Sequence, residues 1–250
     1  MKYALVVNKV TSDINLNVEL ILKFIKEAKS NDAEFIIFPE SAITGFDNRD
    51  IPEYDFKLAF SENSNVIQSI CKSAKENQIY ISLGFFEEDN NSIYDSTICI
   101  DDSGEIICKY RRITKGWHGN EADKEIYKEG EEIKTFYIKN KKYGYLICGD
   151  LFDDKLVHKI REENIDILVF PFARSFYNGH VSQERWDVEE MPSYIEQITK
   201  CNALTLMINY IEHSKSTEYY YFGGAYAVDK LGKVIAKKEN GSEGILYIDI

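Results

Sequence analysis

Residues 143–150 have the sequence YGYLICGD, which predicts a short buried strand that carries a lone cysteine, Cys148, to its end. Two other stretches have a similar form. Residues 35–40, FIIFPE, are an apolar strand followed by Glu40, and residues 108–115, CKYRRITK, are a strand that ends in basic side chains. We expect these three strand ends to bring a carboxylate, a cation and a cysteine together in one site.

Helices and strands alternate through the whole chain. Apolar residues at helical spacing predict a helix from the capping pair at residues 12–13 to residue 28, and further helices at 66–74, 153–163 and 192–202. Strands are predicted at residues 3–8, 35–38, 79–85, 134–139, 143–148, 165–170, 204–210, 219–229, 233–237 and 245–249, with a hairpin over 92–114 that turns at 101–104. Both halves share this rhythm, so we expect an α/β fold in which two mixed sheets pack face to face with helices outside. A chain of 250 residues is expected to form a single domain, residues 1–250.

The composition argues against several classes of partner. A net charge of −12 would repel the phosphates of nucleic acids and anionic membranes. The first apolar run breaks at Asn8, and no run approaches the roughly 18 residues that span a bilayer, so we expect a cytoplasmic protein. Five widely spaced cysteines without a C-x-x-C pair favour reduced thiols over a disulfide framework or a zinc site, and no metal or cofactor is expected. Cys99 and Cys108 are expected to face each other across the hairpin as small core residues.

The three strand ends predict a particular chemistry. A cysteine attacks an acyl carbon as its thiolate, and it therefore needs a base or a positive neighbour. Glu40 can take the thiol proton, pass it to a leaving amine and then activate water against the thioester. A nearby cation and the backbone N–H of Gly149 would stabilise the oxyanion. The alternative for Cys148 alone is a small buried side chain at a strand end.

Taken together, these stretches resemble the nitrilase superfamily of carbon–nitrogen hydrolases. Residues 38–40 match its glutamate motif, residues 146–150 its cysteine motif, 92–104 its hairpin, 126–130 its Phe-x-x-Gly segment and 223–225 its late Gly-Gly-Ser turn. The resemblance implies a four-layer α-β-β-α sandwich, a Glu-Lys-Cys triad and a homodimer.

This chain departs from the family pattern at the cation. The catalytic lysine of the family follows Tyr-Arg, which points to Arg112 as its equivalent. Arginine keeps the positive charge but does not readily exchange a proton. Lys115 lies three residues further on, and its side chain would turn to the same face only if the strand bulges or ends after Arg112. Arg112 and Lys115 therefore both remain candidates for the cation.

Two further residues are candidates for binding the substrate. The resemblance implies a second glutamate in the loop that follows the lysine, and Glu121 is the nearest match. By residue type alone, Glu121 is more simply a solvated charge. Arg174 follows a predicted strand and would bind a substrate carboxylate or form a structural ion pair.

The predicted function is hydrolysis of a small amide or N-carbamoyl compound through a thioester at Cys148, with release of ammonia or an amine. Two alternatives remain open: a catalytically impaired member that binds a small molecule or a protein, because arginine replaces the lysine, and an acyltransferase that uses the same thioester. The substrate pocket is expected to be formed by the loops at residues 41–60, 116–130 and 172–190, and residues 116–132 are expected to be a loop over the site.

Overall fold

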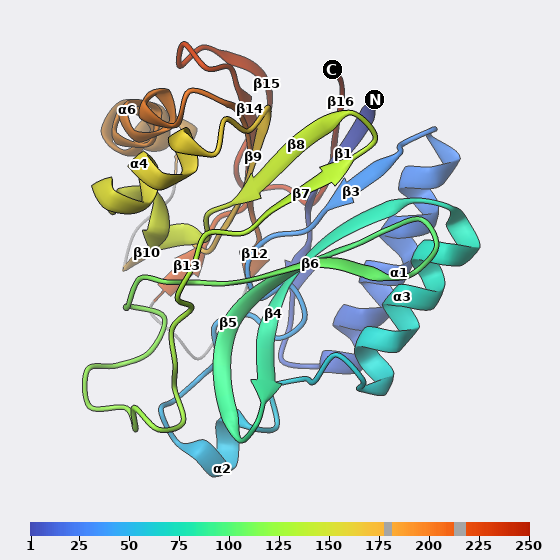
Figure 1. The fold of residues 1–250 in the computed structure, drawn as a ribbon, viewed down its shortest axis with the longest axis vertical. Helices are drawn as coiled ribbons and strands as arrows, with labels where there is room; N and C mark the ends of the chain where they lie inside the picture. The colour runs from blue at the N-terminus through green and yellow to red at the C-terminus, as the bar shows by residue number, and fades with distance from the viewer. Residues whose placement is uncertain (178–181, 213–218) are drawn as a thin grey trace.

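The computed structural model describes residues 1–177, 182–212 and 219–250. Two six-stranded sheets lie face to face, and helices cover the outer face of each sheet (Figure 1). The expected pocket loop at residues 172–190 therefore lies partly outside the described residues. The predicted α/β class and the two mixed sheets are confirmed.

The first sheet is built mainly from the N-terminal half. Helices α1 (Ile14–Ser30) and α3 (Asn65–Asn77) cover its outer face (Figure 1). Strands β1, β3 and β4 are parallel to one another, and the other pairs are antiparallel. Its strand order is β16 (Gly244–Asp249), β1 (Lys2–Val7), β3 (Phe35–Ile37), β4 (Tyr80–Asp89), β5 (Ser92–Ile100) and β6 (Ile106–Arg111).

The second sheet is built from the C-terminal half. Helices α4 (Asp154–Glu162) and α6 (Met191–Cys201) cover it. Its strand order is β15 (Val234–Lys238), β14 (Ala225–Val228), β11 (Leu204–Asn209), β9 (Ile167–Phe172), β8 (Lys141–Tyr145) and β7 (Thr135–Ile138). Smaller elements are β2 (Lys9–Val10), β12 (Ile211–Glu212), β10 (Ser175–Tyr177), β13 (Tyr219–Tyr221), α2 (Pro52–Asp55), α5 (Gln183–Arg185) and the helical turns η1 (Cys148–Phe152) and η2 (Trp186–Glu190).

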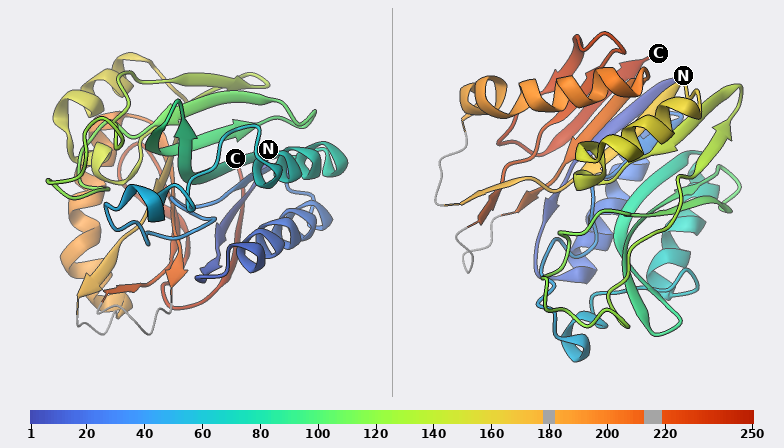
Figure 2. Two further views of the ribbon diagram at one scale, coloured as in Figure 1. Left: turned by 90° about the horizontal axis from the view of Figure 1, so that it is seen from below. Right: turned by 60° about the vertical axis from the view of Figure 1, so that its left-hand side comes forward.

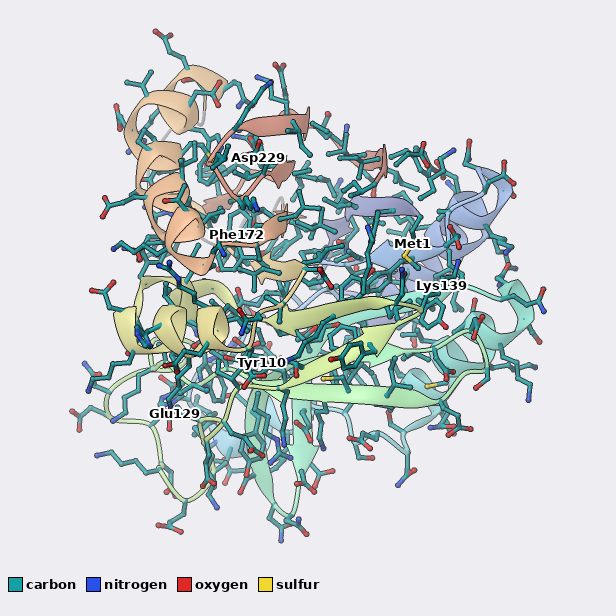
Figure 3. All side chains as sticks on the ribbon, turned by 45° about the horizontal axis from the view of Figure 1, so that its top comes forward. Met1, Tyr110, Glu129, Lys139, Phe172 and Asp229 are labelled. Carbon is teal, nitrogen blue, oxygen red and sulfur yellow. The ribbon has the colours of Figure 1, made fainter. Side chains whose placement is uncertain are left out.

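Alternation along the strands explains the four layers. In β1, Ala4 and Val6 pack under the helices of the first half, whereas Tyr3, Leu5 and Val7 pack against the second sheet. Successive side chains of a strand point to opposite faces, so one strand serves both layers. One further cluster of buried side chains lies between the second sheet and its helices. Figure 2 shows these helices from two other sides, and Figure 3 shows the side chains on the ribbon. The result is the predicted α-β-β-α sandwich.

Local sequence accounts for several element ends. Asp13 caps α1, because its side chain accepts hydrogen bonds from the backbone N–H groups of Asn15 and Leu16. Cys99 lies directly opposite Cys108 in the hairpin, and both are buried and unpaired, as expected. Residues 116–132 contain neither helix nor strand apart from one isolated bridge, in agreement with the predicted loop. Among the described residues, no helix is both long and apolar enough to cross a membrane.

Several predicted boundaries were wrong. Residues 219–229 form two strands, β13 and β14, because Gly223 and Gly224 have φ of 73° and 99° and turn the chain between two different sheets. The strand predicted at 143–148 ends at Tyr145, and the one predicted to run to residue 114 ends at Arg111. Part of the segment between 175 and 190 is regular, with strand β10 and a helical turn before α6.

Candidate active site

Glu40 belongs to the candidate site and lies three residues after the end of β3. Its side chain is fully buried. The backbone here runs close to β4, since a Cβ on Gly84 would lie 2.7 Å from the Cα of Glu40. Glycine at position 84 therefore allows the backbone of Glu40 to approach the sheet.

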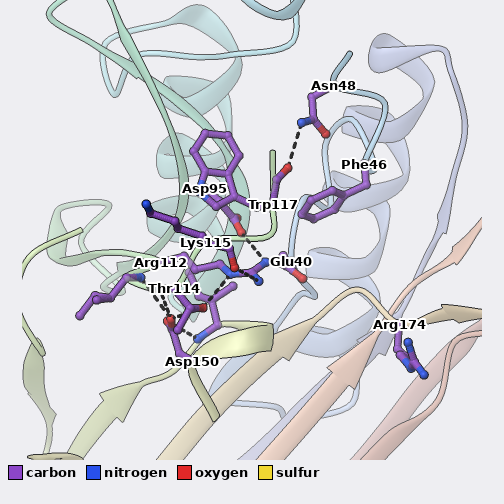
Figure 4. Close-up of polar contacts among 12 residues, drawn as sticks. Glu40, Phe46, Asn48, Asp95, Arg112, Thr114, Lys115, Trp117, Asp150 and Arg174 are labelled. Atoms are coloured by element: carbon purple, nitrogen blue, oxygen red, sulfur yellow. Dashed lines mark hydrogen bonds and ion pairs between the residues drawn. The ribbon is translucent and has the colours of Figure 1, made fainter. Parts of the chain in front are cut away.

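Arg112 follows directly after β6 and points its guanidinium at Glu40 (Figure 4). Its Nη1 lies 3.1 Å from Oε1 of Glu40. The guanidinium also donates to Oγ1 of Thr114 and to the backbone oxygen of Lys115, each at 3.3 Å. The backbone of Arg112 donates to the carbonyl oxygen of Asp95 and accepts from the N–H of Gly130. Arg112 is thus fixed by both its backbone and its side chain.

Lys115 is placed differently from Arg112. Its side chain is exposed, and Figure 4 shows it pointing away from Glu40. Strand β6 ends at Arg111, so strand alternation does not by itself keep the side chain of Lys115 on the face opposite Arg112. The turn that follows nevertheless directs only the backbone oxygen of Lys115 toward the site.

Cys148 begins the helical turn η1, three residues after the end of β8. Its φ of 45° is in the left-handed region, which costs a residue other than glycine about 1–3 kcal/mol. Of the five cysteines, Cys148 alone is partly exposed, and the other four are buried. The strained turn therefore brings one thiol to an accessible position.

Asp150 joins the Cys148 turn to the segment that carries Arg112. Its Oδ1 accepts from the N–H groups of Ile113 and Thr114 at 3.1 and 2.8 Å and from Oγ1 of Thr114 at 2.8 Å. Its Oδ2 accepts from the hydroxyl of Tyr110 at 2.7 Å and from the N–H of Ile147 at 3.2 Å. These bonds hold the cysteine and the cation in a fixed relation.

Gly149 makes close contact with the same cation. A Cβ at position 149 would lie 2.6 Å from Nη2 of Arg112 and 2.9 Å from Oγ1 of Thr114. Only a residue without a side chain fits here without displacing the guanidinium.

The electrostatics of the three residues are coupled. Burial, followed by the proximity of Cys148, raises the pKa of Glu40 to about 8, and Arg112 opposes that shift. Burial disfavours the charged form of Arg112, but the nearby Cys148 and Glu40 outweigh it and raise its pKa. Cys148 therefore lies near enough to Glu40 and Arg112 to influence the pKa of both.

Within the described residues, Glu121 and Arg174 form no hydrogen bond or ion pair with Glu40, Arg112 or Cys148. Glu121 is exposed, in the loop between Arg112 and β7. Arg174 donates two hydrogen bonds to Glu190, at 3.1 and 2.9 Å, and is separated from the cluster in Figure 4. The structure thus gives Arg174 the ion pair that was one of its two interpretations.

Two of the expected pocket loops meet beside the site. Asn48 donates to the backbone oxygen of Trp117 at 2.9 Å, and the N–H of Gly119 donates to Asp50 at 2.9 Å. Burial, followed by the nearby Cys148, raises the pKa of Tyr194, and burial also raises the pKa of Tyr221. Among the described residues, no group of three or more His, Cys, Asp or Glu side chains is arranged to hold a metal ion.

Sequence reasoning gave no role to Asp95, Thr114 or Asp150. Asp95 is buried, and its Oδ2 lies 3.6 Å from Nη1 of Arg112. A signal was present for two of them, because Asp95 is the one acid of strand β5 and Asp150 stands two residues after the cysteine. Their partners are distant in sequence, and only the fold reveals them.

Comparison with known proteins identifies the class. The carbon-nitrogen hydrolase family model matches residues 3–250. The chain is 27% identical to deaminated glutathione amidase of Dictyostelium discoideum over 91% of this chain and 80% of that protein. It is 25% identical to human omega-amidase NIT2 over 100% of this chain and 88% of that protein.

A solved structure shows the same fold. A glutamate-to-glutamine variant of the amidase from Nesterenkonia sp. AN1, with acrylamide added to its active-site cysteine, superposes with a TM-score of 0.80 at 16% identity. The match covers 100% of this chain and 93% of that one. The chain therefore belongs to the carbon–nitrogen hydrolase family, within the nitrilase superfamily. It is an enzyme that hydrolyses C–N bonds other than peptide bonds.

Proposed function

We propose that this protein is an amidase that hydrolyses a small amide or N-carbamoyl compound through a thioester at Cys148. The observation that carries the proposal is that the one partly exposed cysteine, Cys148, lies beside a buried carboxylate and a buried cation. Amidase names among the relatives support the substrate class.

The reaction begins with transfer of the Cys148 proton to Glu40. The thiolate attacks the amide carbon, and the carbonyl oxygen becomes an oxyanion that Arg112 and the N–H of Gly149 stabilise. Glu40 then returns the proton to the leaving nitrogen, and ammonia or an amine departs. Glu40 next takes a proton from water, which attacks the thioester. Collapse of the intermediate expels the Cys148 thiolate and the acid product, and Glu40 returns the proton to the thiolate.

In this proposal Arg112 supplies the cation, and Lys115 does not. Arg112 contacts Glu40 at 3.1 Å, whereas the Lys115 side chain is exposed. Because arginine does not readily give up a proton, Glu40 carries all proton transfers. We expect Arg112→Ala to lower kcat/KM by about 10²-fold or more and Lys115→Ala to leave it nearly unchanged. Equal losses in both variants would contradict this assignment.

The remaining substrate contacts are less direct. Glu121 would reach a bound substrate only if its loop moves inward. Arg174 would bind a substrate carboxylate only in exchange for Glu190. A KM equal to that of the wild type in both Glu121→Gln and Arg174→Gln would remove these residues from the proposal.

The central test is ammonia release from a panel of short primary amides and N-carbamoyl compounds. We expect release by the wild-type protein and none above background by Cys148→Ala. Cys71→Ala is the matched control, because Cys71 is a buried cysteine on α3 with no part in the proposed reaction. Undiminished release by Cys148→Ala would refute the thioester. Transfer of the acyl group to an added amine, seen by product mass, would instead identify an acyltransferase.

We also propose that residues 1–250 form one carbon–nitrogen hydrolase domain, that the protein is a homodimer and that it resides in a reducing cytoplasm. The family match over residues 3–250 supports the single domain, and five unpaired cysteines agree with a reducing compartment. A mass near 29.0 kDa by light scattering would contradict the dimer.

A further inference from the structure

A second buried carboxyl, Asp95, lies beside Glu40. Asp95 is on strand β5, and 1% of its surface is exposed. Its Oδ2 lies 3.6 Å from the same Nη1 of Arg112 that lies 3.1 Å from Glu40 (Figure 4). Two buried carboxyls therefore flank one guanidinium.

The oxygen atoms of this pair lack ordinary donors. Oε2 of Glu40 and both carboxyl oxygens of Asp95 are buried, and no N–H or O–H group of residues 1–177, 182–212 or 219–250 donates to them. Two ionised carboxylates cannot hydrogen-bond to each other, and a buried unpaired charge is costly. One proton between them removes both difficulties, since the two carboxyls lie 3.1 and 3.6 Å from the same Nη1 of Arg112.

We infer that Asp95 is a positioning residue that keeps its proton and donates a hydrogen bond to the carboxylate of Glu40. Glu40 is the member that ionises, because Nη1 of Arg112 lies closer to Glu40 than to Asp95. The hydrogen bond stabilises the ionised form of Glu40 and so keeps a buried base available at lower pH. This inference deepens the proposed function and rests on Glu40 acting as the base.

The groups that face Asp95 agree with this assignment. They are Glu40, Arg112, Asp150 and Tyr110. The hydroxyl of Tyr110 is already donated to Asp150, so it supplies no hydrogen bond to Asp95. Burial, and then the nearby Glu40 carboxyl, raise the pKa of Asp95 well above its usual range.

Cys148 also acts on the pKa of Glu40, and both of these residues act on the pKa of Tyr194 and of Tyr221. These three groups act equally in all variants of Asp95. A change in the pH profile on replacing Asp95 therefore reports on the pair of carboxyls.

The test compares Asp95→Asn with Asp95→Leu. Asparagine keeps a donor to Glu40, so we expect kcat/KM within about threefold of wild type and an unchanged acid limb of the pH profile. Leucine removes the donor and raises the pKa of Glu40, so the acid limb moves up by about one pH unit and kcat/KM at neutral pH falls about tenfold. If Asp95 is ionised in the wild type, both variants would instead shift the acid limb of the pH profile to lower pH. That result would overturn the inference.

An infrared measurement tests the proton without turnover. The difference spectrum of wild type minus Asp95→Asn at pH 9, above the pKa of about 8 of Glu40, should contain the C=O band of a protonated carboxyl that shifts in heavy water. Carboxylate bands in its place would overturn the inference, even where Asp95→Leu does not fold. This readout is independent of catalysis, so a failure of the proposed amidase activity and a failure of this inference are distinguishable.

Discussion

Replacing Gly149 by alanine should damage catalysis and also cost folding stability. The new Cβ would lie 2.6 Å from Nη2 of Arg112, and ordinary contact begins at about 3.4 Å, so the guanidinium has to move by about 0.8 Å. It cannot move freely, because Glu40, Thr114 and the backbone oxygen of Lys115 hold it. Misplacing a catalytic group by about 1 Å costs up to about 10²-fold in rate, which is about 2.7 kcal/mol in the activation barrier.

The assay is kcat/KM for ammonia release, measured together with the melting temperature. We expect Gly149→Ala to lower kcat/KM by several tens to about 100-fold, while overpacking costs about 1–3 kcal/mol of folding stability. The same change in an Arg112→Lys background should have a much smaller effect on kcat/KM, because lysine has no Nη2 to displace. An equal loss in both backgrounds, or no loss in either, would refute the reasoning.

Three further predictions follow from the structure. Iodoacetamide should label Cys148 fastest of the five cysteines, because the other four are buried. Burial also raises the pKa of Cys71 to about 11 and of Cys201 to about 12. Faster labelling of any other cysteine, located by peptide mass, would contradict this prediction. Because Glu40 acts as a base with a pKa of about 8, kcat/KM of the wild type should rise as the pH rises toward 8. Glu40→Gln should lower kcat/KM about 10²–10⁴-fold and abolish this rise with pH. A wild type whose kcat/KM does not change with pH would exclude Glu40 as the titrating base. Gly84→Ala should lower the free energy of unfolding by about 2–3 kcal/mol in a denaturant titration, because its Cβ would meet the rigid backbone at Glu40, and an unchanged midpoint would mean that β3 and β4 separate readily.

The sequence was sufficient to predict most strands and the residues that follow them, because strands are predicted from local patterns of apolar residues. Alternating and continuous apolar runs predict which faces of a strand are buried, and this was sufficient for the two sheets and their outer helices. Glu40 and Cys148 each follow such a run, so the sequence by itself could nominate them. Boundaries were less accurate, since Gly223 and Gly224 divide the strand predicted at 219–229 between different partners.

The tertiary structure decided which side chains face one another. The orientation of Arg112 depends on Asp95 and Gly130, which bond its backbone, and on Asp150, which bonds the two residues after it. None of these contacts is local, so no spacing rule could choose between Arg112 and Lys115. The pairing of Asp95 with Glu40 arises in the same way, because β3 and β5 both flank β4 and bring two carboxyls to one guanidinium. The apolar periodicity of the sequence thus determined the layers of the fold. Hydrogen bonds between residues distant in sequence determined which charged side chains meet in the site.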